Sequence, residues 1–335
     1  MPYSVEGKIV IAITSSALFD MTESDRIFRE KGLIAYKEHQ KKNIDVPLPK
    51  GVAFPFVSRL LKINDDFPNS RPVEVFLMSK NSPESGLRAF NSFKHYNLDI
   101  TRAVLSSGDS NFQYLPAFKA DLFLSSNDED VKEALKRGYP AGKIVHSQID
   151  DDESPELRLA FDFDGVLADD ESEKVYKEKG MEEYRAYESK KVSEPLRPGP
   201  LEPLLKKLSA FQQMERKYGI EHPEYVPKIK TSIVTARNAP AHERMIRTLN
   251  SWGIEVDALF LLGGMNKDSI LSILKPHMFF DDQMVHLENI HAPAVHIPFG
   301  IANKAIGNLN TNPDKDCKGE SVSFCKRIKG ALGLK

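Results

Sequence analysis

The sequence ESDRIFREKG at residues 23–32 recurs as ESEKVYKEKG at residues 171–180. Five of the ten positions are identical, and the other five are conservative pairs such as Arg with Lys and Ile with Val. The offset of 148 residues continues without a gap and pairs Tyr36 with Tyr184. Shared secondary structure gives scattered matches, but a gapless block of this length is hard to obtain that way. We therefore interpret the two stretches as copies left by an internal duplication.

Both halves of the chain, residues 1–150 and 151–335, alternate short apolar runs with amphipathic helical stretches. The runs are residues 8–14, 73–79 and 121–125 in the first half, and 157–163, 229–235, 256–262, 276–282 and 294–299 in the second. Continuous apolar strands that alternate with helices are typical of parallel sheets covered on both faces. The sequence thus predicts an α/β protein of two tandem Rossmann-type halves, which meet near the acidic, proline-containing segment 148–156. Small helical insertions complete the prediction, and residues 171–228 are expected to form a helical cap over the second half.

The composition excludes several classes of protein. The chain has 335 residues, of which 41% are hydrophobic and 28% charged, as in an ordinary folded protein and unlike a disordered one. Its 46 Lys and Arg nearly balance 48 Asp and Glu, and the net charge of −2 supplies no basic field for nucleic acid. No run approaches the roughly 18 apolar residues of a membrane helix, and the first residues lack the apolar segment of a signal peptide. Two cysteines, Cys317 and Cys325, are too few for a disulfide framework, so we expect a cytoplasmic protein.

Carboxylates follow two apolar runs of the second half, at the points where strands are predicted to end. One run leads into Asp162 and Asp164, and a later run ends in Asp281 and Asp282. Ligands of parallel α/β sheets bind beyond the carboxyl ends of the strands, so these four side chains are expected to meet. They cannot all stay ionised without a counterion, and hard oxygen ligands without a Cys and His cluster favour Mg²⁺ over Zn²⁺. We expect Asp281 to bind the metal directly and Asp282 to bind it through water.

Neighbouring groups suit phosphoryl transfer. Thr235 ends an apolar run and Lys267 follows a Gly-Gly turn, so both can hold phosphoryl oxygens and offset developing charge. Asp162 can attack phosphorus as a carboxylate nucleophile, which forms an aspartyl-phosphate. Asp164 lies two residues further on, where it can act first as general acid and then as general base. The expected substrate-binding residues are Thr235, Ala236, Arg237, Asn238 and Lys267.

This order of groups resembles the four motifs of the haloacid-dehalogenase-like (HAD) phosphatases. The sequence DFDGV at residues 162–166 is similar to their first motif. Thr235, Lys267 and the pair Asp281-Asp282 fit the second, third and fourth motifs in order and spacing. The resemblance implies that the second half is a catalytic HAD-like domain and that the first half is a HAD-like copy of it.

Three longer strings resemble the cytosolic type 1 5′-nucleotidase family: ITSSALFD at residues 13–20, FNSFKHY at 90–96 and TARNAPAHER at 235–244. The similarity covers about residues 6–300. It implies Mg²⁺-dependent hydrolysis of nucleoside 5′-monophosphates, often AMP, to nucleoside and phosphate. The resemblance implies this substrate as a partner. A nucleotide effector and, in a homo-oligomer, further copies of the chain are the other partners that we consider; we expect no nucleic-acid and no membrane partner.

Two other functions stay open at this point. A phosphatase of the same superfamily could act on another small phosphoester, because the four motifs do not encode a base and ribose pocket. A non-catalytic nucleotide-binding protein would keep the fold and lose the reactive groups. The second half retains every such group, which argues against this last alternative for the whole chain.

The first half lacks the reactive groups at the positions that the repeat makes equivalent. Thr14 and Ser16 stand in place of Asp162 and Asp164. The other expected replacements are Met78 for Thr235, Lys80 for Arg237, Asn111 for Lys267, and Ser125-Ser126 for Asp281-Asp282. Hydroxyls beside one cation suit an anion without metal chemistry. We expect a non-catalytic half that binds a nucleotide effector or walls the substrate pocket, although small polar residues also end strands without any ligand.

Overall fold

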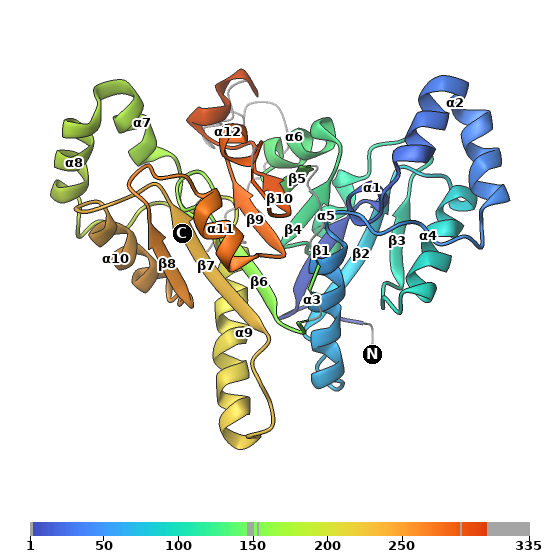
Figure 1. The fold of residues 1–335 in the computed structure, drawn as a ribbon, viewed down its shortest axis with the longest axis horizontal. Coiled ribbons are helices and arrows are strands. Elements are labelled where there is room, and N and C mark those ends of the chain that lie inside the picture. The colour runs from blue at the N-terminus through green and yellow to red at the C-terminus, as the bar shows by residue number, and fades with distance from the viewer. Residues whose placement is uncertain (1–2, 146–150, 153, 289, 307–335) are drawn as a thin grey trace, which may run out of the picture. The chain divides into compact units, whose positions relative to one another are not determined.

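The structure, a computed structural model, describes residues 3–145, 151–152, 154–288 and 290–306 (Figure 1). The strands of the first half are β1 (Ile9–Ile13), β2 (Val73–Ser79), β3 (Arg102–Leu105), β4 (Leu122–Ser125) and β5 (Ala141–Val145). Those of the second half are β6 (Leu157–Phe161), β7 (Ile229–Thr235), β8 (Ala258–Leu261), β9 (Met278–Asp281) and β10 (Ala294–His296). They form one sheet in the order β3-β2-β1-β4-β5-β10-β9-β6-β7-β8, which confirms the predicted α/β class.

The two halves share one strand order. From the outer strand inward it reads β3-β2-β1-β4-β5 in the first half and β8-β7-β6-β9-β10 in the second. Neighbouring strands within each half pair in parallel, and the halves join through the antiparallel pair β5 and β10, with Val295 opposite Ile144. The two parallel-sheet halves expected from the sequence are thus joined edge to edge into one continuous, mixed sheet. The duplication itself stays a prediction.

Helices cover both faces of this sheet. On one face α3 (Phe54–Asp66), α4 (Pro83–His95), α9 (Glu202–Glu221) and α10 (His242–Trp252) contribute to a hydrophobic core that crosses both halves. The opposite face carries a separate core over each half of the described chain, under α5 (Leu115–Phe118) and α6 (Asp128–Lys136) and under α11 (Asp268–Leu274) and α12 (Met284–Leu287). Short elements complete the order, namely α1 (Ser15–Leu18), η1 (Phe112–Tyr114) and η2 (Ile301–Ile306). Among the described residues, every helix is too short or too polar to span a bilayer.

The repeated stretch forms a pair of helices in each half. In the second half α7 (Glu171–Lys179) and α8 (Met181–Lys190) meet at Gly180, whose φ of 89° is readily adopted only by glycine. In the first half α2 (Thr22–Lys42) has its kink at Gly32, with φ 78°. Within the stretch 171–228 that is predicted as a helical cap, α9 packs into the core of the sheet and only α7 and α8 remain outside that core, so the predicted cap is confined to these two helices.

A buried histidine next to β9 should make the fold less stable in mild acid. The backbone N–H of Arg158 donates to Nδ1 of His277 over 3.0 Å, so this nitrogen carries no proton. Burial, together with Arg59 and Arg158, lowers the pKa of His277 to about 4. Between this value and the roughly 6.5 of an unfolded chain, only the unfolded state binds the proton, so the free energy of unfolding falls as the pH falls.

The prediction is checked by chemical denaturation at a series of pH values between about 6.5 and 4. His277→Asn should reduce the pH dependence of the unfolding free energy in this window. His291→Asn is the matched control, because the side chain of His291 is 81% exposed. An unchanged pH dependence in His277→Asn would show that another group is responsible.

Candidate active site

A lysine joins two carboxylates at the carboxyl ends of neighbouring strands. Asp162 follows β6, Asp281 ends β9, and Lys267 immediately precedes α11. The Nζ atom of Lys267 lies 2.7 Å from Oδ2 of Asp162 and 2.6 Å from Oδ2 of Asp281. All three side chains are buried. The predicted convergence of these groups at one edge of the sheet is therefore present in the structure.

Burial and charge act in opposite directions on these groups. Burial raises the pKa of Asp162 to about 6, with Lys267 opposing the shift and Asp281 adding to it. Burial disfavours the charged form of Lys267, but Asp162 and Asp281 outweigh it and raise the pKa of the ammonium. Burial likewise disfavours ionised Asp281, yet Lys267 and His286 hold its pKa below the usual range. Lys267 thus stays charged. Its positive charge, together with His286, outweighs the effect of burial on the pKa of Asp281, but the charge of Lys267 does not outweigh the effect of burial on the pKa of Asp162.

The neighbouring carboxylates Asp281 and Asp282 have different surroundings. Asp281 accepts hydrogen bonds from Lys267 and, over 2.8 Å, from the backbone N–H of Gln283, and Nδ1 of His286 lies 3.1 Å away. Asp282 is 0% exposed, and neither of its carboxylate oxygens has a hydrogen-bond partner among the described residues. Burial, and then Asp281 and Asp162, raise the pKa of Asp282 well above the usual range.

The unpartnered Asp282 carboxylate fits a bound cation. An ionised carboxylate buried without a partner is costly, and a divalent cation with oxygen ligands removes that cost. Asp162 adds to the rise in the pKa of Asp282, and a cation near both carboxylates would offset this repulsion. Whether Asp281 or Asp282 binds the metal directly stays a prediction: Asp281 contacts Lys267 and His286, whereas Asp282 has no hydrogen-bond partner among the described residues. Asp162, Asp281 and His286 also lie close enough together to hold a metal ion. In the structure the ammonium of Lys267 contacts both of these carboxylates.

Gly165 lies directly against this carboxylate. Its φ is +74°, and a Cβ atom at this position would lie 2.5 Å from the carboxyl carbon of Asp282. Gly165→Ala should therefore displace Asp282 and lower the turnover of a phosphoester by about 10²-fold, as ångström-scale misplacements do. Steady-state kinetics check this, with Gly108→Ala as control, since Gly108 has a φ of +102° and no atom near its missing Cβ. Equal activity of the two variants would contradict a role for Asp282.

Asp164 lies on the other side of the site, held by an arginine. Nε of Arg237 donates to Oδ2 of Asp164 and Nη2 donates to Oδ1, each over 2.7 Å. The backbone N–H of Arg237 donates to Oγ1 of Thr235, which fixes the turn after β7. This bidentate ion pair fixes the direction of the Asp164 carboxylate, two residues after Asp162.

These groups line one cavity of about 370 Å³ between the sheet edge and the pair α7 and α8. Of the predicted residues, it brings together Asp162, Asp164, Thr235, Ala236, Arg237 and Asn238. Lys267, Asp281 and Asp282 lie outside the lining itself, in contact with or close to Asp162. A phosphate at Asp162 would thus lie at one side of a space with room for a further small group.

The sequence interpretation missed several residues of this cavity. They come mostly from α7, α8 and the start of α12, namely Glu173, Tyr176, Lys177, Met181, Tyr184, Gln283 and His286. The sequence predicts a helical cap over residues 171–228, which include α7 and α8, but it assigns none of the cap residues to the site. The available signal in the sequence was the presence of Tyr and Met side chains among the charged residues of this stretch. In the structure Tyr176 and Met181 are large apolar groups that remain exposed.

The equivalent region of the first half has a smaller cavity of about 150 Å³, lined by hydroxyl and amide groups. Two of the expected equivalences are off by one residue. β2 ends at Ser79 as β7 ends at Thr235, and Ser79 Oγ accepts the N–H of Asn81 as Thr235 Oγ1 accepts that of Arg237. Ser79 therefore corresponds to Thr235, and Asn81 to Arg237.

Two carboxylates in the smaller cavity weaken the case for an anion site in the first half. Lys80, the cation expected there, forms an ion pair with Asp130, and both line the smaller cavity. Asp25 adds a second carboxylate to the lining. An anion would have to compete with both, so the nucleotide effector and the pocket-wall role stay predictions. Cys317 and Cys325 lie outside the described residues.

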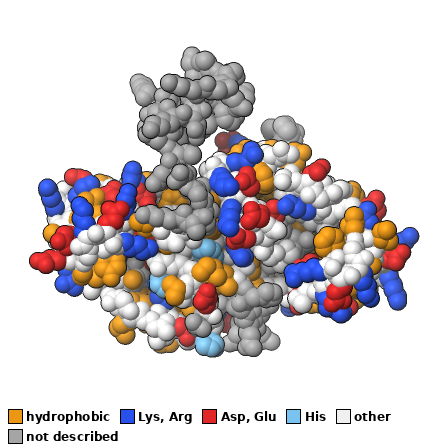
Figure 2. All heavy atoms as spheres, turned by 90° about the horizontal axis from the view of Figure 1, so that it is seen from above, with side chains coloured by type: hydrophobic (Ala, Val, Ile, Leu, Met, Phe, Trp, Pro, Cys, Tyr) orange, Lys and Arg blue, Asp and Glu red, His pale blue; other side chains and the backbone are white. Residues whose placement is uncertain are grey.

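Figure 2 shows Lys and Arg side chains interspersed with Asp and Glu over the face seen from above.

Comparison with known proteins gives matches over most of the chain. Residues 1–304 match the family model described as 5′-nucleotidase. The human protein named cytosolic 5′-nucleotidase 1B is 36% identical over 294 residues, which is 86% of this chain and 48% of that protein. The chain thus spans about half the length of this curated relative. No solved structure matches.

Proposed function

This chain belongs to the 5′-nucleotidase family, and from that premise we propose that it hydrolyses nucleoside 5′-monophosphates to nucleoside and phosphate in the presence of Mg²⁺. The observation that carries the proposal is the meeting of Asp162 and Lys267 with a second carboxylate pair at the edge of one cavity. We also propose that the reaction takes place in the cytoplasm, because the human relative is named a cytosolic enzyme. An effector and a homo-oligomer stay predictions.

In the proposed first step, an oxygen of Asp162 attacks phosphorus and the bond from phosphorus to the O5′ atom of the nucleoside breaks. Asp164 gives its proton to this O5′ atom, so that the nucleoside leaves uncharged. In the second step water attacks the phosphorus of the aspartyl-phosphate, Asp164 takes a proton from that water, and the carboxylate of Asp162 is regenerated. Lys267 and Thr235 offset the charge that develops on the phosphoryl oxygens.

The residues present fit Mg²⁺. The unpartnered carboxylate of Asp282 and the carboxylate of Asp162 would hold it, together with the main-chain carbonyl of Asp164. When bound, the ion would polarise the phosphoryl group and offset its charge. We assign the metal to Asp282, whose carboxylate has no partner among the described residues, and the positioning of Lys267 to Asp281, which contacts it.

The proposal is tested by measuring phosphate release from a panel of nucleoside 5′-monophosphates and sugar phosphates, with Mg²⁺ and again with EDTA. We expect hydrolysis of nucleoside monophosphates that requires the metal. Hydrolysis of sugar phosphates alone would favour the alternative phosphatase of the same superfamily. No release from any compound would contradict the proposal.

A further inference from the structure

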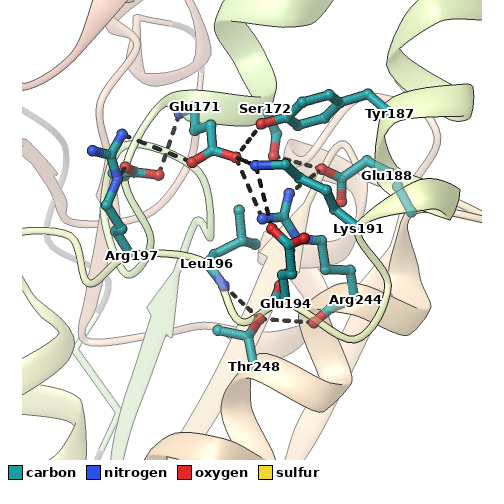
Figure 3. Close-up of polar contacts among 12 residues, drawn as sticks. Glu171, Ser172, Tyr187, Glu188, Lys191, Glu194, Leu196, Arg197, Arg244 and Thr248 are labelled. Atoms are coloured by element: carbon teal, nitrogen blue, oxygen red, sulfur yellow. Dashed lines mark hydrogen bonds and ion pairs between the residues drawn. The ribbon is translucent and has the colours of Figure 1, made fainter.

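A buried glutamate of the cap lies between two arginines of the sheet side. Glu188 of α8 is 1% exposed, and its Oε2 accepts a hydrogen bond from Nη1 of Arg237 over 2.6 Å. Its Oε1 accepts from Nη1 of Arg244 over 3.0 Å and from Oγ of Ser172 over 2.7 Å. Figure 3 shows Glu188, Ser172 and Arg244 converging from α8, α7 and α10. Both carboxylate oxygens of Glu188 are therefore fully used.

Arg237 transmits the position of Glu188 to Asp164. Its guanidinium uses Nη1 on Glu188 and the opposite edge, Nε and Nη2, on Asp164. The side chain of Arg237 is 2% exposed, so water does not compete for these contacts. A planar guanidinium held along one edge presents the other edge in a fixed direction.

The first half contains the same arrangement in an uncharged form. Gln40, the counterpart of Glu188, accepts from Arg88 over 3.3 Å and donates to Ser24 over 2.9 Å. Arg88 and Ser24 correspond to Arg244 and Ser172, and Nε of each arginine donates to a backbone carbonyl at matching positions. Asn81 stands where Arg237 stands, and Ser16 where Asp164 stands.

This comparison separates two roles of the cluster. Packing of the helix pair against the helix that follows needs the arginine, the serine and one amide or carboxylate, and both halves have these. The additional charges, Glu188 and Arg237, occur together and only in the half that carries Asp164. A structural role for the cluster explains the first set of groups and leaves the second unexplained.

We propose that Glu188 is a positioning residue, which holds Arg237 so that Arg237 in turn places Asp164 for proton transfer to the leaving nucleoside. This inference rests on the proposed hydrolysis and adds a group to it. The proton moves from a carboxyl oxygen of Asp164 to O5′ as the phosphorus–oxygen bond breaks, and Glu188 and Arg237 keep their own protonation throughout. α8 of the cap is thereby linked to the chemistry at the sheet edge.

The test compares two substrates in a single turnover of Glu188→Gln. Release of adenosine from AMP needs a proton from Asp164, whereas p-nitrophenolate leaves p-nitrophenyl phosphate without one. Adenosine release should slow by about 10²-fold or more, within the range that general acid catalysis contributes. Release of p-nitrophenol in the first turnover should stay close to the wild-type rate. Equal slowing of both substrates, or of neither, would overturn the inference.

Two further variants separate positioning from folding. Glu215→Gln is the matched control, because Glu215 is also a fully buried, hydrogen-bonded glutamate but lies on α9 and contacts Tyr225 and the backbone of Lys228. It should change stability without changing the ratio of the two release rates. The pair Glu188→Gln with Arg237→Asn reproduces Gln40 and Asn81, so it should be more stable than Glu188→Gln alone.

In this double variant adenosine release should remain slow although stability returns. Restored adenosine release would show that the cluster acts through stability alone, and would overturn the inference. The wild-type protein reports on the proposed function separately. If the wild type releases no adenosine from AMP, it is the proposed hydrolysis that fails; if it does and the Glu188→Gln substrate ratio is normal, only the positioning role fails.

Discussion

Asp162→Asn should lower the turnover of a nucleoside monophosphate by about 10⁴-fold or more, because removing a nucleophile removes the covalent step. The fold should survive, since Oδ1 of Asp162 accepts the N–H of Phe163 over 2.7 Å and the asparagine oxygen can replace it. Nucleotide binding should also persist, as loss of negative charge near a phosphate does not weaken its binding. Steady-state kinetics together with a binding isotherm for AMP check both parts.

The control for this variant is the equivalent position of the first half. Thr14 follows β1 as Asp162 follows β6, and it carries no group able to form a covalent phosphate ester of comparable lability. Thr14→Ala should leave turnover within a factor of about 2, because Thr14 lines the cavity of the first half and not the cavity that Asp162 lines. Turnover retained by a clean preparation of Asp162→Asn would remove Asp162 from the role of nucleophile.

Substitutions of Asp281 and Asp282 should have opposite effects on stability. Without a metal, Asp282→Asn replaces a buried, unpartnered carboxylate with a neutral amide, so the melting temperature in EDTA should rise. Asp281→Asn removes a partner of the buried ammonium of Lys267, so the melting temperature in EDTA should fall. Thermal denaturation of both variants beside the wild type is the measurement.

The effect of Mg²⁺ on the melting temperature should also differ between the Asp281 and Asp282 variants. Mg²⁺ raises the melting temperature of any chain that binds it only when folded, and Asp282→Asn should lose most of this increase. Its turnover should fall by about 10²-fold or more, since a metal contributes several kcal/mol to charge stabilisation. A full Mg²⁺ response in Asp282→Asn together with its loss in Asp281→Asn would restore the original expectation that Asp281 is the direct ligand.

The strands show what sequence patterns can and cannot predict. The continuous apolar runs predicted β2 and β7 with their observed bounds, because strands in the interior of a parallel sheet are buried on both faces. β3 was missed because it is a four-residue edge strand whose residues are only half-buried and begin with Arg102. β5 was missed because its sequence AGKIV contains Gly and Lys, and nothing local indicates that β10 will pair with it.

The site was predictable wherever it depends on strand ends. Asp162, Thr235 and Asp281 directly follow or end parallel strands, and topology alone brings such positions together. The different surroundings of Asp281 and Asp282 could not be predicted, because Lys267, which contacts Asp281, comes from another segment.

Glu188 was not predictable from its surroundings in the sequence. It lies among charged residues on α8, which gave that helix the pattern of a solvent-exposed element, yet it is buried by contacts with segments about 50 residues away. The repeat did hold one signal, since Glu188 aligns with Gln40 at the same offset as the quoted stretches. Only the structure shows that both side chains meet an arginine.

The central claim is that Asp162 carries the phosphoryl group during hydrolysis. The most direct test is to mix the protein with AMP radiolabelled in its phosphate, quench in acid within a single turnover and locate the label by peptide mapping. We expect label on the peptide that contains Asp162; hydroxylamine should release it, as it releases an acyl phosphate, and the label should be absent from Asp162→Asn. Turnover of AMP with no label on this peptide, or with label on another one, would contradict it.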